Sequence, residues 1–146
     1  MKVAVLMENT AQEGCGLVPE HGLSLYIEYR GKRLLLDGGA SGRFADNAQK
    51  LGVDLADVDL GVLSHGHYDH ADGLRRFFQL NQRAKVYVRP QAGGPYFSMT
   101  EEGPKFIGVH RDIWEGARER LVPVPGPMEL LEGGWLLPDG PKDPAF

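Results

Sequence analysis

The chain of 146 residues is long enough for one domain, and a domain of this size buries roughly 70% of the surface that its unfolded chain exposes. Hydrophobic residues make up 42% and charged residues 25% of the chain, a balance that argues against disorder as the dominant state. The formal net charge of −4 provides no general attraction for nucleic acid or for an anionic membrane surface, so we expect neither as a partner.

Cysteine content and hydropathy indicate a compartment. Cys15 is the single cysteine of the sequence, which excludes an intrachain disulfide and fits a reducing environment. The apolar run at residues 3–7 is too short for the hydrophobic region of a secretory signal, and no stretch approaches the roughly 18 apolar residues of a membrane span. We therefore expect a cytoplasmic protein.

Hydrophobic periodicity predicts a strand-rich chain with a few short helices. A first buried strand is expected at residues 3–7, and a breaker-rich loop at 9–22 follows it. Strict alternation from Leu23 to Arg30, a turn at Gly31-Lys32 and the apolar Leu34–Leu36 predict a hairpin. Helices are then expected near 43–51 and 72–80, and strands at 59–64, 84–89, 121–124 and 135–137, with Glu132–Gly134 as the turn between the last two. This order of elements predicts the α+β class.

The chemistry of the sequence is concentrated in Ser64–His70, which holds three of the five histidines between an expected strand and an expected helix. Imidazoles and a carboxylate are suitable ligands for zinc-type metals. In an extended segment His65 and His67 point to the same side, and the turn at Asp69-His70 brings a second pair toward a neighbouring ion. Two neighbouring ions suit the attack of hydroxide on an ester, amide or phosphate. The alternative is a surface loop that is rich in histidine by chance, but an apolar strand leading directly into the cluster favours a metal site.

This pattern resembles a known family. His65–His70 resembles the H-x-H-x-D-H signature of the metallo-β-lactamase superfamily, and Leu35–Gly39 resembles the aspartate-containing strand end that precedes this signature. Further positions resemble a subgroup of metal-dependent hydrolases related to dihydropterin ribofuranosyl-aminobenzene phosphate synthases: Glu20–Ser24, Ser41, Phe44, Asn47-Ala48, Leu51-Gly52 and Gly73-Leu74. The resemblance implies the N-terminal half of an αββα sandwich, a mixed β-sheet with short helices that forms a single half-domain over residues 1–146.

The resemblance also implies roles for individual residues. His65 and His67 would bind a first metal, and Asp69 and His70 a second, with Asp69 also expected to be catalytic. Asp37 would be a buried carboxylate that braces the metal loop, although a cap or turn role after the strand is the alternative. We expect zinc, with manganese or iron as alternatives. Occupancy should be partial, because the family's later histidines and bridging aspartate have no clear counterpart in this sequence.

Other residues could contribute to the site. His21 is expected to line the pocket, and a ligand role is the lesser alternative; His110 is more simply a satisfied or solvent-facing histidine than a ligand. Arg75 belongs either to a solvated helix face or to a contact with an anionic substrate. Turn and cap roles account for the remaining candidates, which are Asp112, Asp139 and Asp143.

Two functions remain open at this point. The first is a zinc-type hydrolase, truncated or split, in which hydroxide attacks an ester or phosphoester of an unknown small molecule. The second is a non-catalytic remnant that serves as a binding or assembly module. A diiron oxidoreductase is disfavoured, because His67 stands where that branch of the superfamily has a glutamate. Half of a sandwich would leave an apolar sheet face bare, so we expect a homodimer or a complementing second half.

Overall fold

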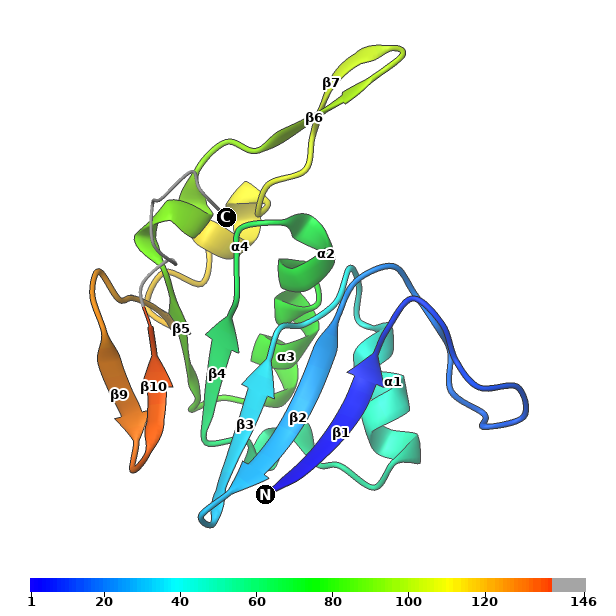
Figure 1. Cartoon of the computed structure of the whole chain (residues 1–146), viewed down its shortest axis with the longest axis vertical. Coiled ribbons are helices and arrows are strands. Elements are labelled where there is room, and N and C mark those ends of the chain that lie inside the picture. Colours follow the sequence, from blue (N-terminus) through cyan, green and yellow to red (C-terminus); the bar gives the residue numbers. More distant parts are fainter. Residues whose placement is uncertain (138–146) are drawn as a thin grey trace, which may run out of the picture.

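The computed structural model describes residues 1–137 and confirms the α+β class. Its main sheet has six strands in the order β1-β2-β3-β4-β5-β8 (Figure 1). The strands β1, β2 and β3 pair antiparallel, and β3, β4, β5 and β8 pair parallel in that order, so the sheet is mixed as expected. The strands are β1 (Lys2–Met7), β2 (Ser24–Tyr29), β3 (Lys32–Leu36), β4 (Leu60–Leu63), β5 (Lys85–Val88) and β8 (Leu121–Pro123).

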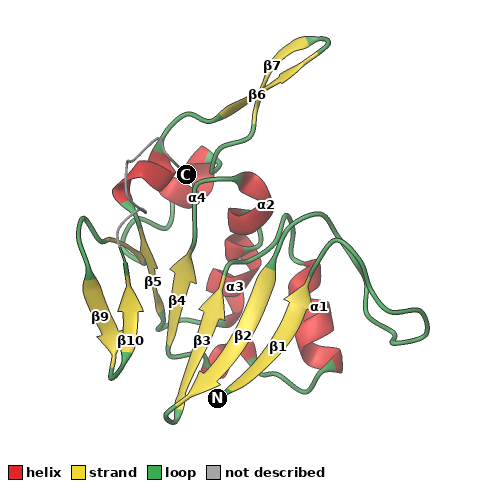
Figure 2. Cartoon of the chain, viewed as in Figure 1, coloured by secondary structure: helices red, strands yellow, loops and turns green. Residues whose placement is uncertain are grey.

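Short helices cover one face of this sheet, which is the far face in the view of Figure 2. The α-helices are α1 (Arg43–Lys50), α2 (Tyr68–Ala71), α3 (Leu74–Leu80) and α4 (Arg111–Trp114), and the 3-10 turns are η1 (Leu55–Asp57) and η2 (Pro90–Gly93). Phe44 of α1 and Phe77 of α3 are both 0% exposed. They pack with Leu35, Leu63 and Val86 of the sheet into one hydrophobic core, whose burial drives the docking of helices that are too short to be stable alone.

The opposite face of the sheet is apolar and only partly covered. Val3, Ile27 and Leu34 are consecutive cross-strand partners, so their side chains share this face. Val3 is 48% exposed. The hairpin of β9 (Met128–Leu131) and β10 (Gly134–Leu136) lies against part of the face, and a cleft of about 500 Å³ remains between them.

The last third of the chain differs from the sequence-based prediction in one turn and in one additional hairpin. The turn that we expected between 121–124 and 135–137 instead joins β9 to β10, because β8 pairs with β5 in the main sheet. The hairpin of β6 (Phe97–Thr100) and β7 (Gly103–Phe106) was not predicted, and it projects from the body of the molecule (Figure 1). Its strands pair only with each other, and nearly all of their residues are exposed, so no alternation of buried and exposed positions marks them in the sequence.

The expected helix at 72–80 begins later than predicted. The chain forms α2 first and then α3, which starts at Leu74 after a break at Gly73. At Gly73 the chain packs directly on the loop after β3, since an added methyl group would lie 1.9 Å from the Gly38 carbonyl oxygen. This contact holds the β3 loop against the start of α3. None of the helices within residues 1–137 has the length and hydropathy to cross a membrane.

Candidate metal centre

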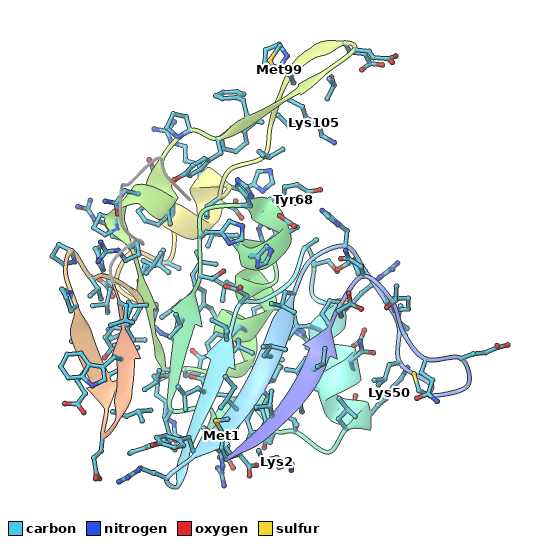
Figure 3. All side chains as sticks on the ribbon, viewed as in Figure 1. Met1, Lys2, Lys50, Tyr68, Met99 and Lys105 are labelled. Atoms are coloured by element: carbon cyan, nitrogen blue, oxygen red, sulfur yellow. The ribbon has the colours of Figure 1, made fainter. Side chains whose placement is uncertain are left out.

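The histidine cluster lies where β4 ends and α2 begins, and Figure 3 labels Tyr68 at the start of α2. The ring centroid of His65 lies 4.6 Å from that of His67 and 4.2 Å from that of His70. The chain can bend closely here because Gly66 has no side chain: an added methyl group would lie 2.3 Å from the Ala92 carbonyl oxygen. Three of the four predicted ligands are therefore brought together.

The segments on either side of the projecting β6–β7 hairpin contact the same loop. His67 forms an isolated antiparallel bridge with Gly108, and the Tyr68 amide donates to the Ile107 carbonyl at 2.9 Å. Tyr96, at the base of the projecting hairpin, packs edge-on against the His67 ring with a centroid distance of 5.4 Å. These neighbours lie 29 or more residues later in the chain, so no local pattern in the sequence indicates them.

Asp37 links the end of β3 to the cluster. It is 1% exposed and has a φ of +60°. Its carboxylate accepts hydrogen bonds from the Ser64 amide at 2.7 Å, from the Ser64 hydroxyl at 2.6 Å and from His70 Nδ1 at 2.8 Å. An imidazole that donates through Nδ1 to a carboxylate keeps Nε2 free for a metal, and this is the usual arrangement around metal-bound histidine.

The imidazoles of His65 and His70 have pKa values that are shifted in opposite directions. The hydrogen bond to Asp37 raises the pKa of His70 above its usual value, against the opposing effect of burial. Burial, followed by the nearby His70 and His67, lowers the pKa of His65. The Ser64 hydroxyl lies 2.9 Å from His65 Nδ1, and because its own hydrogen is donated to Asp37, its oxygen accepts a hydrogen bond from the Nδ1–H of His65. His65 therefore also presents an unprotonated Nε2, the form in which imidazole binds a metal.

Asp69 points toward two imidazoles. Its Oδ2 atom lies 3.2 Å from Nε2 of His21 and 3.7 Å from Nε2 of His70. His21 belongs to the loop before β2, and the fold brings its ring to Asp69 of the metal loop, while its role as a pocket residue stays a prediction. Asp69 is largely buried, with a side chain 13% exposed, whereas the His21 side chain is 67% exposed.

The donor chemistry at this site fits a zinc-type metal, because imidazole nitrogens with fixed tautomers and a partly buried carboxylate face one another. As the side chains stand, however, residues 1–137 contain no group of three histidine, cysteine, aspartate or glutamate side chains that could hold an ion. Ligand roles for His65, His67, Asp69 and His70 stay predictions, and so does the metal role of Asp37.

The remaining candidates are engaged elsewhere. His110 Nδ1 lies 2.8 Å from the Asp72 carboxylate, and Arg75 is paired with both Asp72 and Asp112. Because two carboxylates neutralise Arg75, the alternative of an anionic-substrate contact loses its support. The Arg75 guanidinium in turn holds the pKa of Asp112 below its usual range. Asp139 and Asp143 lie outside the described residues, and Cys15 is an exposed thiol.

Comparison with known proteins places this chain in a family. The family model of the metallo-beta-lactamase superfamily matches residues 17–139. An uncharacterized protein of Methanocaldococcus jannaschii is 32% identical over 114 residues, which cover 77% of this chain and 42% of the relative. The 7,8-dihydropterin-6-methyl-4-(beta-D-ribofuranosyl)-aminobenzene-5'-phosphate synthase of the same organism is 28% identical over 150 residues, covering 97% of this chain and 46% of the relative.

Solved structures give the same assignment. A metal-dependent hydrolase of the beta-lactamase superfamily is 28% identical with a TM-score of 0.66, and the match covers 89% of this chain and 44% of that one. A subclass B3 metallo-beta-lactamase from a soil metagenome library is 25% identical with a TM-score of 0.51, covering 77% of this chain and 44% of that one. The chain thus spans less than half the length of these relatives, and it belongs to the metallo-beta-lactamase superfamily.

Proposed function

We propose that this chain forms the metal-binding part of a zinc-type hydrolase that acts on an ester or phosphoester of a small molecule. The observation that carries the proposal is the buried Asp37 carboxylate, which holds His70 through Nδ1 and the start of the metal loop through Ser64. A carboxylate buried to this degree is costly unless it is fully paired, and its pairing here fixes a histidine with Nε2 free.

Each residue of the cluster has a distinct part in this proposal. His65 and His67 would hold one metal, and Asp69 and His70 a second, while Tyr96 packs edge-on against the His67 ring. A bound metal of this type lowers the pKa of water toward about 7 and polarises the scissile group. Asp37 and Ser64 keep the imidazoles in the tautomers that bind metal.

A second function is supported by a different observation. Since no three donors of residues 1–137 are placed to hold an ion, this chain alone would bind metal weakly. It would then be a binding or assembly module, and hydrolysis would require donors from a second copy of the chain or from a separate second half.

A hydrolysis screen separates the two functions. We would assay phosphodiester, lactone and thioester substrates with added zinc or manganese, using the chain alone and the chain co-expressed with the coding sequence that follows it. The proposal expects little turnover from the chain alone. It expects turnover from the co-expressed pair, which we call the completed form, and this turnover should be abolished by His67→Ala and retained in His110→Ala. His110 is a matched control, because it is a histidine outside the predicted ligand set and its ring is hydrogen-bonded to Asp72. Equal rates for His67→Ala and wild type in the completed form would refute the hydrolase.

A further inference from the structure

We propose that His21 is a third protein ligand for the ion that Asp69 and His70 would hold. The inference rests on the metal site of the proposed function and extends it to a residue of a different segment, the loop before β2. It implies that residues 1–137 contain a complete set of three protein donors, two imidazoles and one carboxylate, without any contribution from outside the chain.

The spacing of the donor atoms supports this role. Zinc binds nitrogen and oxygen donors at about 2.0–2.2 Å in tetrahedral geometry, which places any two donors of one ion about 3.3 Å apart. His21 Nε2 lies 3.2 Å from Asp69 Oδ2, and His70 Nε2 lies 3.7 Å from the same atom. Both separations are close to this value, and both imidazoles present the same nitrogen to the carboxylate.

A distance of 3.2 Å would also suit an ordinary hydrogen bond or ion pair, so the surroundings of His21 decide between the two roles. An exposed ion pair contributes little to stability and needs no dedicated framework. His21, however, is held by contacts of both neighbouring residues. The Glu20 carboxylate accepts from the Ser41 hydroxyl at 2.8 Å, and the Gly22 amide donates to the side chain of Asn9 at 2.9 Å.

The most demanding of these contacts is the one between Gly22 and Asp69. Gly22 has a φ of +122°, and an added methyl group there would lie 2.0 Å from the Asp69 carbonyl oxygen. Only glycine permits this backbone conformation and this approach. The backbone that carries His21 is therefore packed directly on the backbone of Asp69, which fixes the distance over which the two side chains meet.

In their present positions the three side chains of residues 1–137 do not converge on a common metal position. The contacts of each side chain indicate which one would have to rotate. His70 is held by Asp37, and Asp69 is largely buried. The His21 side chain is 67% exposed, so its ring can rotate about a fixed backbone. Two imidazoles and one carboxylate with an open fourth position form the donor set of catalytic rather than structural zinc sites.

Zinc and cobalt binding to the full chain tests the inference with His21→Ala, His21→Gln and the control His110→Ala. Glutamine keeps a donor that can hydrogen-bond to Asp69, but its neutral amide is a poor zinc ligand. Removing a residue that merely orients a ligand costs about 10–100-fold in metal affinity, so loss of a ligand should cost more than about 100-fold. We expect that loss in both His21 variants, with a weakened cobalt absorption band, and wild-type affinity in His110→Ala.

Three results would overturn the inference. Wild-type affinity in His21→Ala shows that His21 has no part in binding, and wild-type affinity in His21→Gln shows that it only hydrogen-bonds to Asp69; in both cases the proposed hydrolase stands. A wild-type chain that binds no zinc at all overturns the inference and removes support from the hydrolase. Conversely, zinc binding that depends on His21 without turnover in the completed form supports the inference while the hydrolase fails. The thermal unfolding midpoint of each metal-free variant should equal that of wild type, which shows that the folds are intact.

Discussion

Replacement of Asp37 tests whether this residue holds the metal loop to the sheet. The carboxylate is 1% exposed and accepts three hydrogen bonds, two from Ser64 and one from His70. Its backbone has a φ of +60°, a conformation that glycine, asparagine and aspartate tolerate better than alanine. A series of Asp37→Asn, Asp37→Gly and Asp37→Ala therefore separates the hydrogen bonds from the backbone conformation.

The expected losses follow from these contacts. Alanine leaves the Ser64 amide and His70 Nδ1 without their acceptor, and an unsatisfied donor costs about 1–3 kcal/mol. Removal of a buried charge offsets part of this loss, so we expect Asp37→Ala to lower the free energy of unfolding by about 3 kcal/mol. Glycine relieves the strain at φ +60° and should be about 1 kcal/mol more stable than alanine. Asparagine keeps one acceptor oxygen and should lose about 1–2 kcal/mol.

Urea-induced unfolding with a chelator present measures this series without any contribution from bound metal. The predicted order of stability is wild type, asparagine, glycine and then alanine. A loss below about 1 kcal/mol for Asp37→Ala would show that the three hydrogen bonds do not hold the loop, and an alanine variant more stable than glycine would contradict the argument from φ.

Three further predictions concern metal content, assembly and pH. Elemental analysis after dialysis should find at most one zinc ion per chain and less in His70→Ala, and two tightly held ions would contradict this. Light scattering at micromolar concentration should find a dimer or larger species that Val3→Lys weakens, because Val3 lies on the partly covered sheet face; a well-folded wild-type monomer would be the opposite result. Because Arg75 lowers the pKa of Asp112, this pair contributes stability above the unfolded pKa that is lost as the pH falls through the folded pKa. Asp112→Asn should remove less than about 1 kcal/mol of this acid dependence, as measured from urea midpoints, and an unchanged pH profile would refute it.

Alternation of apolar and polar residues predicted those strands that have one buried face and one more exposed face. The hairpin of β2 and β3 was expected at 23–30 and 34–36, and it occupies Ser24–Tyr29 and Lys32–Leu36, because alternation fixes which side chains face the core. The β6–β7 hairpin lacks such alternation, and β9 could not be separated from the surrounding prolines. Where pairing involves only one neighbouring strand and no core, the sequence contains no periodic signal of it.

The candidate site divides in the same way. The cluster from His65 to His70 was found because its donors are contiguous in sequence. The pairs His21–Asp69 and His110–Asp72 join residues 48 and 38 positions apart, and only the packing of the loop before β2 and the start of α4 brings them together. Asp37 was expected through the family resemblance, and its positive φ and three bonds became visible only in the fold.

The last prediction concerns the apolar sheet face and the ion assigned to His65 and His67, for which residues 1–137 offer only two donors. This chain spans 44% of the similar solved hydrolase, and Val3, Ile27 and Leu34 share a face that the β9–β10 hairpin covers only in part. If the partner that covers this face also supplies donors to the cluster, zinc binding and assembly must strengthen each other by the same factor. Sedimentation across a range of concentrations, with zinc and with chelator, should then show tighter assembly with zinc, and His67→Ala should abolish the difference. Assembly that is equally strong in both conditions would show that the covering partner contributes no ligand, and the metal would then depend on the donors of this chain alone.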